Sequence, residues 1–102
     1  MRFRIARTDG PRFTFGPERY EVALRPIGTR ARSEQTTADW RIRVEKATFT
    51  FAFVAEGIEI TVEGTMPPRR VKIVVQEIAE NIAAYTEQYG KVEELSEPPP
   101  EK

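Results

Sequence analysis

The sequence of 102 residues predicts an α+β fold, in which an antiparallel β-sheet of five or six strands, arranged as hairpins and a meander, packs on one face against a single C-terminal α-helix. Two patterns predict this fold class. Apolar and polar residues alternate over most of the first 64 residues, as in strands with one buried face. After Pro68 the apolar residues recur every three or four positions, which is typical of an amphipathic helix. We expect one domain over residues 1–90, followed by a disordered acidic, Pro-rich tail over residues 91–102.

The N-terminal quarter predicts three strands, the first two of which form a hairpin. Arg2–Arg7 alternates with its apolar side chains mainly at odd positions, and Asp9-Gly10-Pro11 follows as a turn signal. A first hairpin into Arg12–Phe15 is therefore expected. Alternation resumes over Arg19–Arg25, and Pro26 ends that predicted strand because proline cannot donate a backbone hydrogen bond.

The middle of the chain predicts a long loop and then a three-stranded meander. Residues 26–38 have no period and form the longest predicted internal loop. Trp40–Val44 has its apolar residues at even positions, whereas Thr48–Phe53 has them at odd positions. Since the phase cannot change within one regular strand, residues 45–47 are expected to form a tight turn. Ile58–Glu63 is the third strand.

The C-terminal third predicts one helix over Gln76–Tyr89, ended by Gly90. Two interpretations of Val71–Val75 stay open at this point. The segment is either the first turns of that helix or, because of its β-branched residues, a seventh strand.

The composition excludes most enzyme and metal chemistry. The chain has no His and no Cys, so it lacks the usual neutral-pH base, the thiol nucleophile and the imidazole or thiolate ligands of most metal sites. It also contains neither of the glycine-rich phosphate loops. We expect no enzymatic activity and no cofactor.

The hydropathy predicts a cytoplasmic protein. The longest apolar stretches fall far short of the roughly 20 residues that span a bilayer. The N-terminus, Met-Arg-Phe-Arg-Ile-Ala-Arg, lacks the apolar segment of a signal peptide. No membrane interaction is expected.

The net charge of zero conceals an asymmetry. Residues 1–46 contain 11 basic and 6 acidic side chains, and residues 47–102 carry the opposite excess. The split is explained either by a basic binding surface with an acidic tail or by two halves that pair within one fold. We favour internal pairing, since opposite charges on neighbouring strands commonly pair across a sheet.

Arginines interleave with aromatic residues along the predicted strands, a chemistry that single-stranded nucleic acid binders use for phosphates and bases. The candidate contacts with nucleic acid or another partner are Arg2, Arg4, Arg41, Arg43, Trp40 and Tyr20. Neighbouring strand residues point to opposite faces, however, so arginines and aromatics are expected on different surfaces. This favours a solvated sheet face on which the arginines pair with glutamates.

A second basic feature lies where the helix begins. Arg69 and Arg70 follow two prolines, and positive charge at a helix start is opposed by the helix dipole. The pair is a candidate anion site, although a solvated turn explains it more simply. An enzymatic hypothesis would place a pocket between loop 26–38 and this helix start, with Arg30 or Arg32 also binding an anionic substrate.

In layout alone, three strands in meander order followed by one helix over residues 39–90 resemble the whirly and Pur-type single-stranded nucleic-acid-binding modules. The resemblance rests on no motif. We expect a small non-catalytic interaction module that binds a protein partner or its own copy, as a homo-oligomer, through the sheet face or a sheet edge. The alternative is a single-stranded nucleic-acid-binding module that uses the strand arginines.

Overall fold

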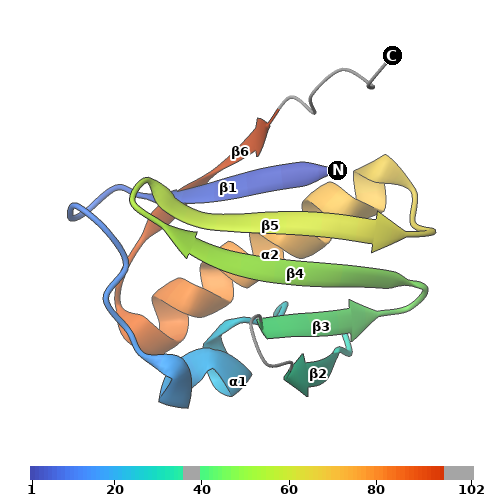
Figure 1. Cartoon of the computed structure of the whole chain (residues 1–102), viewed down its shortest axis with the longest axis horizontal. Coiled ribbons are helices and arrows are strands. Elements are labelled where there is room, and N and C mark those ends of the chain that lie inside the picture. The colour runs from blue at the N-terminus through green and yellow to red at the C-terminus, as the bar shows by residue number, and fades with distance from the viewer. Residues whose placement is uncertain (36–39, 96–102) are drawn as a thin grey trace.

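The computed structural model describes residues 1–35 and 40–95, which form a six-stranded sheet with one long helix across it (Figure 1). The strands are β1 (Arg2–Arg7), β2 (Arg32–Gln35), β3 (Trp40–Val44), β4 (Ala47–Val54), β5 (Gly57–Gly64) and β6 (Gly90–Leu95). The helices are the 3₁₀ turn η1 (Pro17–Arg19), the short α1 (Tyr20–Ala23) and the long α2 (Pro68–Thr86). The predicted α+β architecture is confirmed.

All neighbouring strands in the sheet are antiparallel, in the order β2-β3-β4-β5-β1-β6. The predicted meander is β3, β4 and β5. The first strand of the chain lies beside β5, where Phe3 pairs with Ile60, and the last strand lies on the other side of β1, where Val92 pairs with Ile5. The first and last strands of the described chain are therefore neighbours in the sheet (Figure 1).

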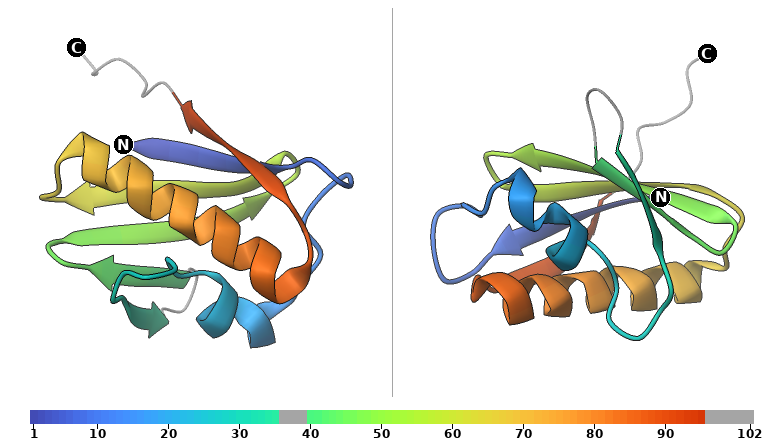
Figure 2. Two further views of the ribbon diagram at one scale, coloured as in Figure 1. Left: turned by 180° about the vertical axis from the view of Figure 1, so that it is seen from behind. Right: turned by 90° about the horizontal axis from the view of Figure 1, so that it is seen from below.

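The core lies between the sheet and α2, which crosses one face (Figure 2). Most fully buried side chains come from the inward positions of the four inner strands and from one stripe of α2, as the two sequence periods require, and Ala23 and Leu24 at the end of α1 join them. Val71–Val75 belongs to α2, so of the two interpretations of this segment the helix is correct. Val71, Val74 and Val75 face the sheet, whereas Ile73 is 45% exposed. No helix in residues 1–35 and 40–95 has the length and apolar character needed to cross a membrane.

The predicted end of the helix at Gly90 is wrong. The cap residue is Glu87, whose φ of 59° is left-handed and whose N–H donates to the Ala83 carbonyl at 2.9 Å. Gly90 instead begins β6 at a point of close contact. A Cβ atom there would lie 2.6 Å from Ile5 Cγ2 and 2.8 Å from Phe13 Cζ, so glycine is required for packing.

The predicted N-terminal hairpin is wrong because its place in the sheet is occupied. Both sides of β1 are already paired, with β5 and with β6. Arg12–Phe15 is irregular, and Phe13 and Phe15 close one end of the core.

The strand predicted over Arg19–Arg25 is also wrong. Pro17 opens η1, and Tyr20–Ala23 continues as one helical turn. Ala23 and Leu24 are adjacent and both fully buried, which a strand with one buried face does not allow.

Two segments predicted to lack regular structure are strands. Residues 32–35, within the predicted loop 26–38, form the edge strand β2, whose polar sequence gives no apolar alternation. Residues 90–95, mostly within the predicted tail, form β6, with six residues in register with β1. The disorder predicted for residues 96–102 lies outside the described residues.

Candidate functional site

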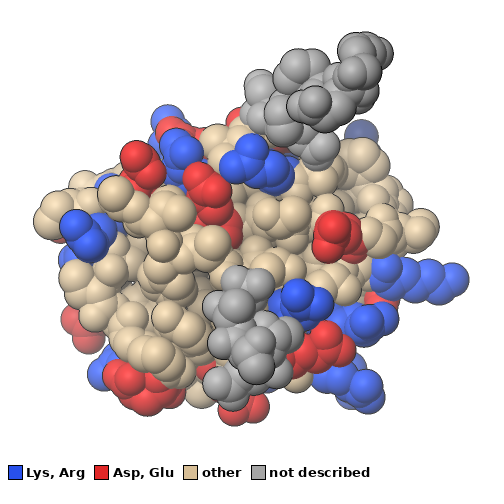
Figure 3. Space-filling view, viewed as in Figure 1, with Lys and Arg blue, Asp and Glu red and all other residues tan. Residues whose placement is uncertain are grey.

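The sheet face opposite α2 is not covered by any described element, and we call it the open face (Figure 2). Its centre carries the uncharged side chains Thr48, Thr50, Ala52 and Thr61. Figure 3 views this face and shows two groups of charged side chains with uncharged surface between them. The open face therefore has a small, uncharged centre and a charged periphery.

Arg2 and Arg4 of β1 are both ion-paired within the fold, to one shared carboxylate. Each guanidinium places an Nη2 atom 3.2 Å from one of the two carboxylate oxygens of Glu59 on β5. The Glu59 side chain is only 23% exposed, and Arg4 is its direct partner in the β1–β5 register. The cross-strand pairing expected from the sequence is thus present at this end of the open face.

Arg41 and Arg43 of β3 are compensated much less. Arg43 Nε lies 3.6 Å from Glu34 Oε2, which is too far for a good hydrogen bond, and the two side chains are 54% and 36% exposed. The buried Nε of Arg41, like that of Arg4, has no hydrogen-bond partner within the described part of the chain, and unlike Arg4, Arg41 has no ion pair there. Arg32 stands directly opposite Arg43 in the β2–β3 register and adds a further positive charge. The β2–β3 end of the open face is therefore net positive.

The two aromatic candidates lie away from these arginines. Trp40 is on the same side of β3 as the buried Ile42 and Val44, and its ring centroid is 5.9 Å from that of Tyr20. Tyr20 in turn stacks on Phe53 with centroids 5.2 Å apart. Burial raises the pKa of Tyr20, and the negative charge of Glu18 acts in the same direction, so the phenol stays neutral at pH 7. The six candidate contacts do not form one surface.

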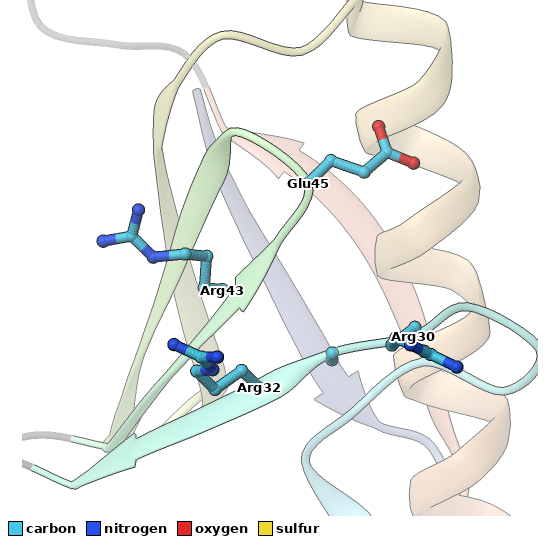
Figure 4. A pocket seen from close by; sticks show the side chains of 5 residues that line it. Arg30, Arg32, Arg43 and Glu45 are labelled. Carbon is cyan, nitrogen blue, oxygen red and sulfur yellow. The ribbon is translucent and has the colours of Figure 1, made fainter.

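A pocket of about 600 Å³ opens between the start of β2 and the β3–β4 turn (Figure 4). Its lining residues are Arg30, Ala31, Arg32, Arg43 and Glu45. Arg30 and Arg32 were expected from the sequence to line a pocket near here, but Arg69 and Arg70 of the helix start, expected with them, are not among its lining residues. Three arginines and one glutamate line the pocket, so basic residues outnumber acidic ones there.

The two arginines of the helix start are not equivalent. Arg70 Nη2 lies 3.2 Å from Glu45 Oε2 and 3.4 Å from Thr29 Oγ1, so it ties α2 to the β3–β4 turn and the loop before β2. Arg69 is exposed and has no ion pair within the described residues. The predicted anion site at Arg69 and Arg70 is therefore not assembled as a pair, and Arg30 and Arg32 line the nearby pocket instead.

The sequence analysis missed the role of Glu45. The predicted turn at 45–47 is confirmed, since Val44 pairs with Ala47, but Glu45 has a φ of 57°, which is unusual for a residue other than glycine. The phase change between the two strands locates this turn, yet only the folded chain shows that its carboxylate meets Arg70. No cluster of acidic side chains among the described residues is placed to hold a metal ion.

A second hollow of about 540 Å³ lies between α1 and α2. It is lined in part by the exposed apolar side chains Val22, Ile27 and Tyr85. Below it, the buried Asn81 donates to the carbonyls of Val22 and Ala23 and so fixes α1 on α2. The sequence analysis missed this hollow because it assigned Val22 to a strand.

Comparison with protein-family models, curated proteins and solved structures gave no match. The likeness of residues 39–90 to whirly and Pur-type modules is thus supported by no relative. The functional argument rests on the geometry alone.

Proposed function

We propose that this protein is a non-catalytic interaction module that binds a protein partner through the β2–β3 end of its open face, and that the partner presents acidic side chains there. One observation carries the proposal. Arg2 and Arg4 share a partner within the fold, whereas Arg41 and Arg43 lack an equivalent one. A carboxylate from outside would accept hydrogen bonds from the exposed guanidinium of Arg43 and would compensate the neighbouring charge of Arg41.

The shape of the open face supports a protein partner. Interfaces between proteins combine an uncharged centre with a polar rim, and the threonine-rich centre between two charged groups has this arrangement. Basic residues outnumber acidic ones by two on the described part of this face, with Arg2, Arg4, Arg32, Arg41, Arg43 and Lys91 against Glu34, Glu59, Glu63 and Glu93. A partner with acidic side chains therefore fits better than a second copy of the same face.

The sheet edges are poorer candidates than the face. β2 is only four residues long, and β6 carries Lys91, Glu93 and Glu94. Short edge strands and charged edge residues are the features by which proteins discourage strand addition.

The nucleic-acid alternative is supported less well. Binding of a single strand needs a continuous positive path and aromatic faces on the same surface. Here Glu59 interrupts the positive charge between the two ends of the open face, and Trp40 and Tyr20 lie on the opposite side of the sheet.

Fluorescence anisotropy tests the proposal against this alternative. We would titrate the protein into a labelled peptide of alternating Glu and Leu residues and, separately, into a labelled single-stranded oligonucleotide of equal charge, at about 50 mM and about 200 mM salt. The expected result is tighter binding of the peptide than of the oligonucleotide at both salt concentrations, with light scattering showing a monomeric protein. Preferential binding of the oligonucleotide, or no binding of the peptide at low salt, would sink the proposal.

A matched pair of variants locates the surface. Replacing Arg43 by Glu is expected to weaken peptide binding about tenfold, which corresponds to about 1.4 kcal/mol. Arg12→Glu makes the same charge change on the exposed loop after β1, far from the β3–β4 turn, and is expected to leave binding within about twofold.

A further inference from the structure

Arg32 and Arg43 face each other directly across two neighbouring strands. They are Cα partners in the β2–β3 register, and their side chains extend on the same side of the hairpin (Figure 4). Like charges directly opposite each other destabilise a sheet. A fold that retains two arginines in this relation has an unfavourable contact that an anion between them would relieve.

Among the described residues, the nearby glutamates compensate this pair of arginines weakly. Glu34 is the Cα partner of Arg41, and its ion pair is with Arg43, through Nε and at 3.6 Å. Glu45 is engaged by Arg70 at 3.2 Å, and in Figure 4 it extends toward α2, away from Arg32 and Arg43. Within the described residues, Arg32 has no ion pair. Arg30 lines the same pocket, but in Figure 4 its side chain extends away from Arg32 and Arg43.

We infer that Arg32 and Arg43 form a binding site for the phosphate group of a phosphate monoester. Each guanidinium presents a planar fork of N–H donors, and two forks can share the three terminal oxygens of one phosphate. A carboxylate, with two oxygens, is satisfied by one fork. The charge of a phosphate monoester, between about −1.5 and −2 at pH 7, matches the two cations better than a singly charged diester does.

The inference goes beyond the proposed function and does not depend on it. Its ligand is one compact dianion held by Arg32 and Arg43, whereas the proposed protein partner extends from Arg43 over Arg41 and the centre of the open face, so the two share only this end of the face. A nucleic-acid strand fits the pocket less well, since its phosphates are diesters and the positive charge stops at Glu59.

Isothermal titration calorimetry and thermal unfolding test the site with defined probes. Glycerol phosphate is compared with dimethyl phosphate and sodium acetate, all at one ionic strength adjusted with sodium chloride and at a pH above about 6, the second pKa of a monoester. The expected result is measurable heat and a higher melting temperature with glycerol phosphate only. Equal effects of glycerol phosphate and dimethyl phosphate, or none beyond sodium chloride, would overturn the inference.

The variants Arg32→Gln and Arg43→Gln test whether glycerol phosphate binds at these two side chains. Both side chains are exposed, so both variants are expected to fold, and each should weaken glycerol phosphate binding about tenfold. Arg12→Gln is the matched control and should bind as the wild type does. Undiminished binding by the double variant Arg32→Gln/Arg43→Gln contradicts the site.

The order of melting temperatures gives a second signature. Without phosphate and at low salt, Arg32→Gln should melt above the wild type, because it removes the repulsion from Arg43. With saturating glycerol phosphate the wild type should melt above the variant. If Arg32→Gln melts below the wild type without phosphate, the two arginines do not repel and the argument for the site fails.

A phosphopeptide distinguishes the two sources of such a group. Equal affinity for glycerol phosphate and for a phosphoserine peptide supports recognition of the phosphate group itself. Tighter binding of the peptide, lost on dephosphorylation, supports the same site with a phosphorylated protein as its source.

Discussion

Arginine side chains of one sequence pattern have different surroundings in this protein. Arg4 and Arg43 both stand on outward positions of strands, yet Arg4 has a carboxylate partner that is 23% exposed at 3.2 Å, and Arg43 has one that is 36% exposed at 3.6 Å. The difference arises from the neighbouring strand, since β5 brings Glu59 beside Arg4 while β2 brings Arg32 opposite Arg43. Sequence alternation predicts the face on which each arginine lies, but strand order decides its partner.

Removing the shared carboxylate should affect the fold. Glu59→Gln leaves Arg2 and Arg4 without their ion pairs, so we expect the free energy of unfolding in urea to fall by about 1 kcal/mol. Glu63→Gln, an exposed change four residues further along the same strand and on the same face, should remain within about 0.5 kcal/mol of the wild type. Equal stabilities of Glu59→Gln and Glu63→Gln would contradict the assigned pairing.

Asp9 makes the stability depend on pH. Its Oδ1 accepts hydrogen bonds from Arg7 Nε at 2.7 Å and from the Tyr89 N–H at 3.1 Å. The bond from Arg7 lowers the pKa of Asp9, and the Tyr89 N–H acts in the same direction. A carboxylate with a lowered pKa stabilises the fold above its usual pKa of about 3.9, and this contribution disappears as the pH falls through the lowered value.

We therefore expect Asp9→Asn to melt below the wild type at pH 7, with the difference shrinking toward about pH 2 as the wild-type carboxyl becomes protonated. Melting curves followed by circular dichroism across this range measure the effect. A constant difference between the two proteins at every pH would show that the charge of Asp9 is irrelevant.

At the scale of elements, periodicity predicted every strand that has two paired neighbours and an apolar inner face. It failed where a short alternation had no available neighbour, as at Arg12–Phe15, or where a helical turn imitated alternation, as at Tyr20–Leu24. It also missed β2 and β6, whose residues are mostly polar because they lie at the edges of the sheet. Because edge strands bury little apolar surface, their sequences show only a weak alternation of apolar and polar residues.

The junction between α2 and β6 depends on Gly90. Gly90→Ala would place a methyl group within 3 Å of Ile5 and Phe13, both buried, and we expect a loss of about 1–3 kcal/mol in the free energy of unfolding. Gly16→Ala is a suitable control, because its Cβ would meet only the mobile carboxylate end of the exposed Glu18. Urea titrations that find the two variants equally stable would contradict the close packing at Gly90.

At the scale of the whole molecule, the charge asymmetry of the sequence is only partly cancelled by folding. The basic N-terminal half and the acidic C-terminal half meet where β1 lies beside β5, and Glu59 pairs with both arginines there. β2 and β3 both come from the basic half and pair with each other, so their charges add. The sequence alone predicts that these arginines lie on outward positions of strands. It does not predict that β2 pairs with β3, because that depends on the strand order.

The most direct test of the account compares the two pairs of strand arginines in one assay. The double variants Arg2→Gln/Arg4→Gln and Arg41→Gln/Arg43→Gln carry the same change in charge at opposite ends of the open face. By fluorescence anisotropy with the labelled acidic peptide, we expect Arg41→Gln/Arg43→Gln to bind at least about tenfold more weakly than the wild type and Arg2→Gln/Arg4→Gln to stay within about threefold. Equal losses in both variants, or a larger loss in Arg2→Gln/Arg4→Gln, would contradict the claim that the β2–β3 end of the open face is the binding surface.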